Sequence, residues 1–285
     1  MQSIFRYPGG KTRKNVRDLI LSYAPEHFSE YREPFVGGGG IFFAISVKKK
    51  RWINDANKDL ISVYNALKER PDDFIAQCRT IDPPKPGEPE VHTLYGGRGK
   101  KYNQRLRGQF YYFALNKECD QALRYFFINR TVWGGRVNYD IPSRLYYSNP
   151  AGWNIVRSDK LGQAAKVLKD AKITAGDFED VINVSGENTW IYCDPPYFRD
   201  TLDNDASKLY QDSFSEKDHE RLFRTVSACS HRVCISYDDV PEIVDMYSGW
   251  NIHRVKWTYC GTSSAEGCGK TKRKGDELLI TNYDF

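Results

Sequence analysis

The sequence predicts an α/β fold in which an insertion splits an alternation of strands and helices, and a β-hairpin completes the sheet. Three observations support this prediction. Short apolar strands alternate with helical segments up to residue 69. The alternation stops at Ile81 to Glu90, which is rich in proline and polar residues, and returns at Lys172. Two apolar strands, residues 251–260 and 277–283, follow near the C-terminal end of the sequence.

The first part of the sheet is predicted from four neighbouring segments. Lys11 to Tyr23 has apolar residues at helical spacing, and a short strand then runs into four glycines, Gly37 to Gly40. The apolar stretch "IFFAISV" after the glycines predicts a helix. A second strand ends at Asp55, and residues 58–69 predict the next helix, so this region begins a βαβ unit.

The second part of the sheet follows the insertion. Three more strands are predicted at residues 172–178, 189–198 and 232–239. A helix is expected between the last two, at about residues 215–229, because Ser215 and Asp218 match a capping box. We therefore expect a main domain of residues 1–70 and 171–285, with residues 71–170 as an inserted domain.

Composition excludes several classes of protein. No run in the 285 residues approaches the roughly 18 apolar residues of a membrane span, and Arg6 and Lys11 precede any apolar stretch of signal-peptide length. We therefore expect a cytoplasmic protein that does not bind membranes. The seven cysteines are odd in number and scattered, without a C-x-x-C pair, which is typical of reduced thiols. The histidines are dispersed as well, so we expect no protein-bound metal.

Positive charge is concentrated in the insertion. The net charge of the chain is only +5, but Arg98 to Arg144 contains ten Lys or Arg, three Asp or Glu and ten aromatic residues. Basic side chains suit a phosphate backbone, and aromatic rings stack on bases, so this block is a candidate nucleic-acid surface. A solvated basic face over an aromatic core is the alternative.

The segment "RYPGGKT", Arg6 to Thr12, ends like a phosphate-binding P-loop. That loop needs a glycine where this sequence has Phe5, and a buried strand before it, for which residues 1–5 are barely long enough. The sequence therefore argues against a nucleoside triphosphate site, and the segment needs another role.

The four glycines and Asp55 favour a Rossmann-like nucleotide site. Glycine admits a ligand close to the backbone, and a carboxylate at the tip of the next strand accepts hydrogen bonds from ribose hydroxyls. The sixth position of the usual G-x-G-x-x-G pattern, counted from Gly37, is Phe42. This favours a nucleoside cofactor without a diphosphate. A plain glycine-rich turn is the alternative.

Asp194-Pro195-Pro196-Tyr197 follows the predicted strand "TWIYC". Two prolines cannot continue a central strand, so the chain must leave the sheet at its carboxyl edge, where open α/β sheets bind ligands. A carboxylate, a backbone carbonyl and an aromatic ring are presented there together. The set suits an exocyclic amino group whose ring stacks on the tyrosine. A proline-rich strand exit with a surface Asp and Tyr is the alternative.

In this order, "RYPGGKT", "EPFVGGGG", "NDAN", "GDF" and "DPPY" resemble the Dam-type family of DNA adenine-N6 methyltransferases, the alpha group or D12 class, over nearly the whole sequence. The resemblance implies a Rossmann-like S-adenosylmethionine-dependent methyltransferase sheet with a terminal β-hairpin and an inserted, mainly helical target-recognition domain. It implies site-specific transfer of a methyl group from S-adenosylmethionine to the 6-amino group of a flipped-out adenine in duplex DNA. Whether the enzyme belongs to a restriction-modification pair, acts alone or is phage-encoded stays open.

The resemblance also assigns the residues of the site. Those implied in cofactor binding are Tyr7, Gly9, Gly10, Lys11, Phe35, Gly37, Gly38, Gly39, Asp55, Asp177, Phe178 and Asp194. Lys11 is expected near the carboxylate of the cofactor, Asp55 at the ribose, and Asp177 with Phe178 at the adenine.

The catalytic residues implied are Asp194, Pro195, Pro196 and Tyr197. The Asp194 carboxylate and the Pro195 carbonyl would accept the two N–H groups of the target. Tyr197 would stack on the extruded base, and its hydroxyl is expected to contribute little.

The segment "FFINRTVWGGRVNYDIPSR" resembles the recognition hairpin of the family in a shortened form, at about residues 130–144. With the basic loop "KTKRK" it is expected to contact double-stranded DNA. The DNA-binding residues implied are Arg98, Asn129, Arg130, Trp133, Arg136, Asn138, Lys270, Lys272, Arg273 and Lys274. Changes at Arg130 or Arg136 are expected to alter sequence preference, whereas the loop is expected to contact phosphates.

Two other functions stay open at this point. An amino-methyltransferase acting on N4 of cytosine in DNA, on adenine in RNA or on a protein side-chain amide would use a similar site. The Asp that begins D-P-P-Y favours adenine, and the basic insertion favours duplex DNA. A catalytically silent DNA-binding module is disfavoured by the full set of cofactor residues. The sequence does not decide between a monomer and a dimer.

Overall fold

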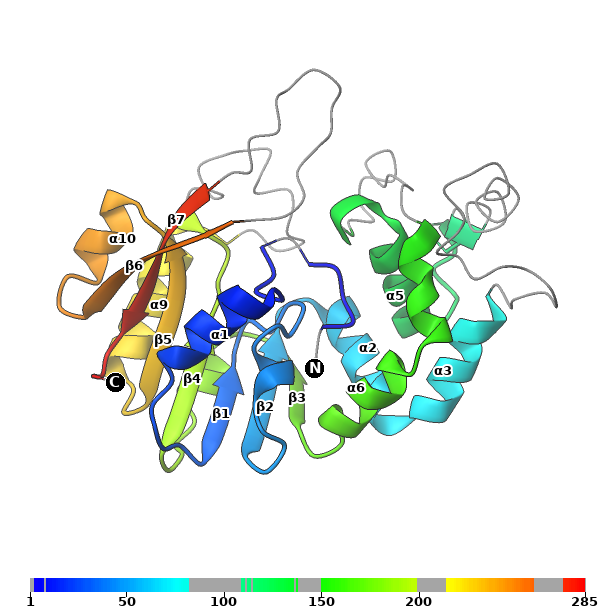
Figure 1. The fold of residues 1–285 in the computed structure, drawn as a ribbon, viewed down its shortest axis with the longest axis horizontal. Helices are drawn as coiled ribbons and strands as arrows, with labels where there is room; N and C mark the ends of the chain where they lie inside the picture. Colours follow the sequence, from blue (N-terminus) through cyan, green and yellow to red (C-terminus); the bar gives the residue numbers. More distant parts are fainter. Residues whose placement is uncertain are drawn as a thin grey trace, which may run out of the picture.

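A computed structural model of the chain describes residues 3–7, 9–81, 109–110, 112–113, 115–135, 137, 150–198, 214–258 and 274–284. Within these residues the fold is α/β, as the sequence predicts, and its strands form one seven-stranded sheet (Figure 1). The strand order is β3-β2-β1-β4-β5-β7-β6. The strands are β1 (Glu30–Glu33), β2 (Lys50–Asp55), β3 (Lys172–Ala175), β4 (Thr189–Cys193), β5 (Arg232–Asp238), β6 (Asn251–Thr258) and β7 (Lys274–Thr281).

The first five strands pair in parallel, and the last two form the predicted hairpin. β1 pairs with β2 and β4, β2 with β3, and β4 with β5, all in parallel. β7 is antiparallel to both β5 and β6, so it lies between them. The central strand β4, "TWIYC", is buried at every residue, which explains its unbroken run of large side chains.

Helices cover the sheet and continue beyond the β3 edge. The described α-helices are α1 (Lys14–Ser22), α2 (Lys58–Glu69), α3 (Pro71–Thr80), α5 (Gln121–Thr131), α6 (Lys160–Leu168), α7 (Glu179–Ile182), α9 (Glu216–Ala228) and α10 (Pro241–Met246). Three short 3₁₀ helices are η1 (Phe42–Ala44), η3 (Trp133–Gly135) and η5 (Pro150–Arg157). In Figure 1, α2, α3, α5 and α6 gather on the far side of β3.

Local signals explain where two of the helices begin. The Asn57 side chain accepts a hydrogen bond from the Leu60 N–H (3.0 Å), and α2 occupies the predicted residues 58–69. The predicted capping box of Ser215 and Asp218 is present at the start of α9. The helix predicted for "IFFAISV" is wrong, since only the three residues of η1 are helical there.

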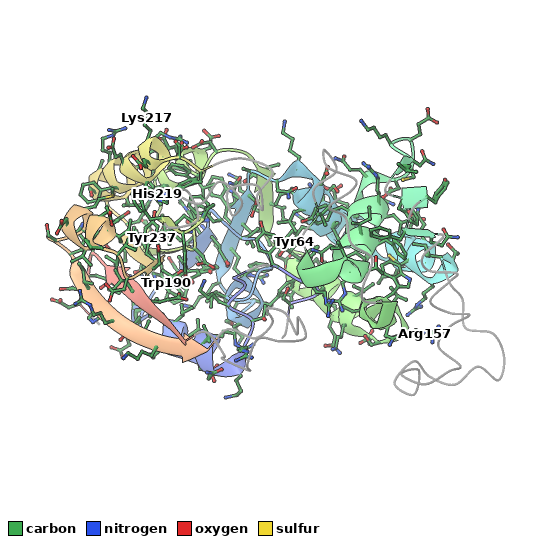
Figure 2. All side chains as sticks on the ribbon, turned by 90° about the horizontal axis from the view of Figure 1, so that it is seen from above. Tyr64, Arg157, Trp190, Lys217, His219 and Tyr237 are labelled. Atoms are coloured by element: carbon green, nitrogen blue, oxygen red, sulfur yellow. The ribbon has the colours of Figure 1, made fainter. Side chains whose placement is uncertain are left out.

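One hydrophobic core joins the strands to the insertion. Tyr31 and Trp190 from the sheet belong to the same buried cluster as Phe126 and Trp153 from the insertion. Tyr64 on α2 lies at the junction between the two parts (Figure 2). The predicted domain boundaries near residues 70 and 171 stay a prediction, because α2 packs against both the strands and α5.

No helix among the described residues is long and apolar enough to cross a membrane. The same part of the chain holds no group of three or more His, Cys, Asp or Glu that could bind a metal ion. Its five cysteines, Cys78, Cys119, Cys193, Cys229 and Cys234, are free thiols.

Candidate active site

The strand order reverses between β1 and β4. β2 and β3 continue from β1 in one direction, and β5 continues from β4 in the other. Open α/β sheets bind ligands at such a reversal, beyond the carboxyl ends of the strands. Residues 34–40 follow β1 there, and Asp194 to Phe198 follow β4. The fold therefore brings the glycine loop and the D-P-P-Y segment to the position where a ligand is expected.

The glycine loop is shaped around Tyr7. Gly37 and Gly39 have φ of +43° and +66°, a left-handed conformation that favours glycine. A Cβ added to Gly37 or Gly38 would lie 2.9 or 3.1 Å from Tyr7, so this side chain rests directly on the loop. The Gly37 N–H donates to Asp55 Oδ2 (2.8 Å). Four residues predicted to bind the cofactor, Tyr7, Gly37, Gly38 and Asp55, thus lie together.

Tyr64 supports this loop by a hydrogen bond to its backbone. The sequence did not predict this role. Its hydroxyl donates to the Gly37 carbonyl oxygen (2.9 Å), and its ring packs 4.9 Å from that of Phe5. The side chain is fully buried. Its only signal in the sequence was its position on the apolar face of the predicted helix 58–69.

Asp194 lies in a hydrogen-bonded network. Lys11 Nζ donates to Asp194 Oδ1 (2.7 Å) and to the Gly9 carbonyl oxygen (3.1 Å). Ser236 Oγ donates to the same Asp194 oxygen (2.6 Å) and pairs with the Tyr192 hydroxyl (2.9 Å). Both contacts fall on Oδ1, which leaves Oδ2 for a further donor.

Lys11 is paired with Asp194. Its side chain is only 4% exposed and forms an ion pair with the Asp194 carboxylate. The contact with the carboxylate of a cofactor that the resemblance implied stays a prediction. Because a buried ammonium needs a counter-charge, this pair explains how Lys11 is held in the interior.

Glu33 is a buried carboxyl group near the partly exposed Asp194. It ends β1 and accepts a hydrogen bond from the Tyr31 hydroxyl (2.6 Å). Burial raises the pKa of Glu33 well above its usual value, and the charges of Asp194 and Asp55 act in the same direction. The neutral acid is therefore favoured, and a cation bound nearby would favour the carboxylate.

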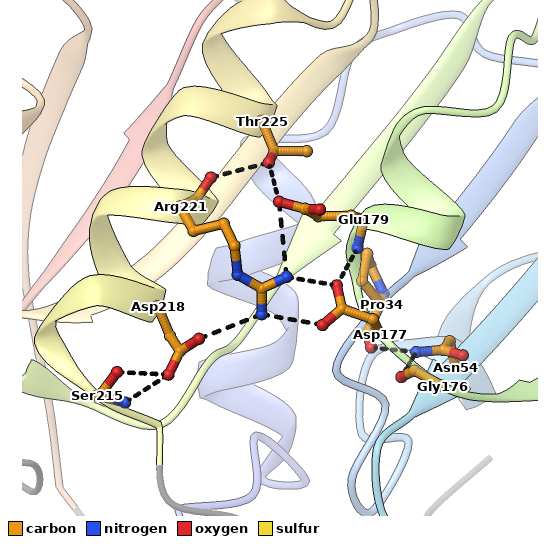
Figure 3. A network of polar contacts seen from close by, with 9 residues as sticks. All are labelled: Pro34, Asn54, Gly176, Asp177, Glu179, Ser215, Asp218, Arg221 and Thr225. Carbon is orange, nitrogen blue, oxygen red and sulfur yellow. Dashed lines mark hydrogen bonds and ion pairs between the residues drawn. The ribbon is translucent and has the colours of Figure 1, made fainter.

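Arg221 on α9 organises the residues predicted for the adenine of the cofactor (Figure 3). It donates to both carboxylate oxygens of Asp177, at 2.9 Å each, and its guanidinium lies 4.3 Å from the centre of the Phe178 ring. The Glu179 N–H also donates to Asp177 Oδ1 (2.9 Å). Since each carboxylate oxygen has about two acceptor positions, Oδ2 keeps one for a ligand. Neither Arg221 nor this geometry was foreseen from the sequence.

Two residues expected to contact DNA, Asn129 and Arg130, form hydrogen bonds with the protein's own backbone. Asn129 is fully buried; its amide accepts from the Arg6 N–H (3.1 Å) and donates to the carbonyl oxygens of Arg6 (2.7 Å) and Gly135 (3.0 Å). Arg130 donates to the carbonyl oxygens of Gly152 (2.9 Å) and Ile4 (3.1 Å). Burial, with the charge of Arg6, lowers the pKa of Arg130 to about 10. The Asn129 amide and the Arg130 Nε and Nη1 groups are therefore used in contacts with the protein's own backbone, and DNA contacts of the two residues stay a prediction.

The other DNA-binding residues stay predictions. Trp133 begins η3 and Lys274 begins β7. The remaining ones, Arg98, Arg136, Asn138, Lys270, Lys272 and Arg273, lie outside the described residues.

Comparison with protein families identifies the family of this chain. A family model described as D12 class N6 adenine-specific DNA methyltransferase matches residues 7–260. The chain is 26% identical to the type II methyltransferase M1.LlaDCHI of Lactococcus lactis subsp. cremoris, with 98% of this chain and 94% of the relative covered. It is 29% identical to the type II methyltransferase M.MjaIII of Methanocaldococcus jannaschii, with 99% of each covered. It is 25% identical to the DNA adenine methylase of Escherichia coli strain K12, with 87% of this chain and 84% of that protein covered.

Proposed function

Because this chain belongs to the D12 class N6 adenine-specific DNA methyltransferases, and so is an adenine-specific DNA methyltransferase, we propose that it transfers the methyl group of S-adenosylmethionine to an adenine flipped out of duplex DNA. The observation that carries the proposal is the position of Asp194. It follows β4 at the reversal of strand order and shares this edge of the sheet with the glycine loop of β1.

The chemistry requires a more nucleophilic amino group. The lone pair of adenine N6 is delocalised into the ring, so the planar amine attacks poorly. Asp194 Oδ2 and the Pro195 carbonyl oxygen would each accept one of its N–H groups and favour a pyramidal nitrogen with its lone pair exposed. The new N–C bond would form as the bond from the methyl group to sulfur breaks, which releases S-adenosylhomocysteine, and the cationic amine would then lose one N–H proton. Positioning and electrostatic stabilisation supply most of the catalysis, and no general base is needed for the attack itself.

The residues around the glycine loop fit S-adenosylmethionine, which supplies a methyl group on a sulfonium. Gly37 and Gly39 adopt positive φ, and Tyr7, Tyr64 and Phe43 fill the space that their side chains would take, so these glycines give the loop its shape. Asp177 Oδ2 would accept one N–H of the adenine amino group, and Phe178 would contact the ring. A nucleoside cofactor without a diphosphate agrees with the absence of a P-loop pattern in the sequence.

Duplex DNA is the substrate that we propose, with the insertion as the recognition domain. Extruding a base costs a few kcal/mol, and stacking on Tyr197 would offset about 1–3 kcal/mol of it.

Incubation of the purified protein with labelled S-adenosylmethionine and duplex DNA tests the function. We expect the label in N6-methyladenine after digestion to nucleosides, and mapping in a restriction-deficient host should then show the recognised sequence. Label in N4-methylcytosine, or only in an RNA of matching sequence, would contradict the proposal.

Replacing Arg221 tests the adenine pocket. Arg221→Ala frees the Asp177 carboxylate to rotate, and we expect about three- to tenfold weaker binding of S-adenosylhomocysteine by calorimetry, a modest loss because the pair is partly exposed. Arg221→Lys should give an intermediate loss, since an ammonium cannot bind both oxygens in a fixed plane.

Arg224→Ala is the matched control for this experiment. Arg224 lies on the same helix, but its side chain is 69% exposed and 4.0 Å from Glu220. Equal affinities in the Arg221→Ala and Arg224→Ala variants would remove Arg221 from the cofactor site.

A further inference from the structure

Ser236, Asp238 and Glu277 form a polar patch on one face of the sheet. Ser236 and Asp238 are two residues apart on β5, so their side chains point to the same face. Asp238 is the register partner of Glu277 on the antiparallel strand β7, which places both on that face. All three residues are buried, at 0%, 6% and 2% exposed. Buried polar groups require hydrogen-bond partners.

All three find a partner in the segment Asp194 to Phe198. Ser236 Oγ donates to Asp194 Oδ1 (2.6 Å). Asp238 Oδ1 accepts from the Phe198 N–H (3.0 Å). Glu277 Oε2 accepts from the Tyr197 hydroxyl. The polar patch therefore holds the first, fourth and fifth residues of this segment.

We propose that Glu277 is a positioning residue for methyl transfer, which fixes the Tyr197 ring through its hydroxyl before the target base arrives. The inference rests on the proposed stacking of Tyr197 on the flipped adenine. A tyrosine ring turns about two side-chain bonds, and a hydrogen bond at its far end restricts both. Lys11 Nζ lies 4.9 Å from the centre of the Tyr197 ring and is also paired with the Asp194 carboxylate. The ring, the ammonium group and the carboxylate therefore keep fixed positions relative to one another. Ordering the ring in the free enzyme lowers the entropy lost on binding.

The protonation of Tyr197 agrees with this role. Burial, together with the charges of Asp194 and Glu277, raises the pKa of Tyr197 well above its usual value. The hydroxyl therefore stays protonated and remains a donor to Glu277. This contact differs from the expectation, made from the sequence, that the hydroxyl contributes little.

Steady-state kinetics on duplex DNA test the inference with Glu277→Ala, Glu277→Gln, Tyr197→Phe and the Tyr197→Phe, Glu277→Ala double variant. We expect Glu277→Ala and Tyr197→Phe each to lower kcat about tenfold, with an unchanged KM for S-adenosylmethionine. Glu277→Gln should restore most of kcat, because its amide oxygen still accepts from the hydroxyl. The double variant should be no slower than the slower single variant, since both changes remove one interaction.

Thr281→Ala is the control for a general effect on β7. Thr281 is fully buried on the same strand, but its hydroxyl donates to the Tyr283 carbonyl oxygen (2.9 Å) and not to the D-P-P-Y segment. The kcat of the Thr281→Ala variant should stay near that of the wild type.

Three results would overturn the inference: Glu277→Gln as slow as Glu277→Ala, multiplied losses in the double variant, or Tyr197→Phe at full kcat. The wild-type reaction separates this test from the proposed function. Adenine methylation by the wild type with any of those three results removes only the role of Glu277, whereas a wild type that methylates no adenine removes the function itself.

Discussion

Asp194→Asn should lower kcat at least about 100-fold while the protein stays folded and still binds its cofactor. The Asn oxygen can replace Oδ1 as acceptor for Lys11 and Ser236, so the network that holds the side chain survives. The amide nitrogen would then stand where Oδ2 stood. It would present a donor to the amino group of the adenine, which is itself a donor. The loss therefore concerns the chemical step and not the assembly of the site.

Single-turnover rates and calorimetric affinities check this expectation. The affinity of the Asp194→Asn variant for S-adenosylhomocysteine should stay within about threefold of wild type, because in the proposed function the lost acceptor, Oδ2, binds the target base. Asp18→Asn is a suitable control, since Asp18 lies on the surface in an ion pair with Lys14. An Asp194→Asn enzyme that kept a tenth of its activity would refute the role given to Oδ2.

Asn129→Ala should lower the free energy of unfolding by about 2–5 kcal/mol. The substitution removes three hydrogen bonds and leaves the N–H and C=O of Arg6 and the carbonyl of Gly135 without the Asn129 amide. Unsatisfied buried backbone groups cost more than the mean value of a hydrogen bond. Urea denaturation measures the change. Asn129→Asp should cost at least as much as Asn129→Ala at neutral pH, because it buries a carboxylate with one oxygen against the carbonyl oxygens of Arg6 and Gly135.

Asn251→Ala provides the comparison. Asn251 is exposed on β6, so this substitution should lower the free energy of unfolding by less than about 1 kcal/mol. If Asn129→Ala had wild-type stability but altered the preference for DNA sequence, the predicted DNA contact would be supported.

Much of the fold could be predicted because its signals are local. Asn57, Ser215 and Asp218 mark helix starts by hydrogen bonds that span three residues, and the two prolines after β4 mark a strand end. The failed helix after Gly40 has a tertiary cause. A Cβ on Gly40 would lie 2.8 Å from the Lys11 backbone, so packing against the N-terminal segment fixes the chain there whatever the helical pattern of "IFFAISV" suggests.

Only those residues of the candidate site that belong to a sequence motif could be predicted. The glycine loop, Asp55 and Asp194 were expected together because strand ends of one sheet meet at one edge. Ser236, Glu277 and Arg221 carry no motif, and their roles depend on the register of β5 with β7 and on the approach of α9 to Asp177. The backbone contacts of Asn129 and Arg130 could not be foreseen, because polar residues in a basic block look alike whether they face DNA or the protein interior.

The position of β7 between β5 and β6 has a consequence for synthesis on the ribosome. Lys11 meets Asp194 across 183 positions of the chain, and Tyr197 meets Glu277 across a further 80. Contacts of such long range favour slow folding, because the intervening chain must be closed into loops first. β5 stays an unpaired edge until residues 274–281 have emerged. A nascent chain therefore contains the glycine loop and the D-P-P-Y segment long before Glu277 on β7 has been synthesised and can fix Tyr197.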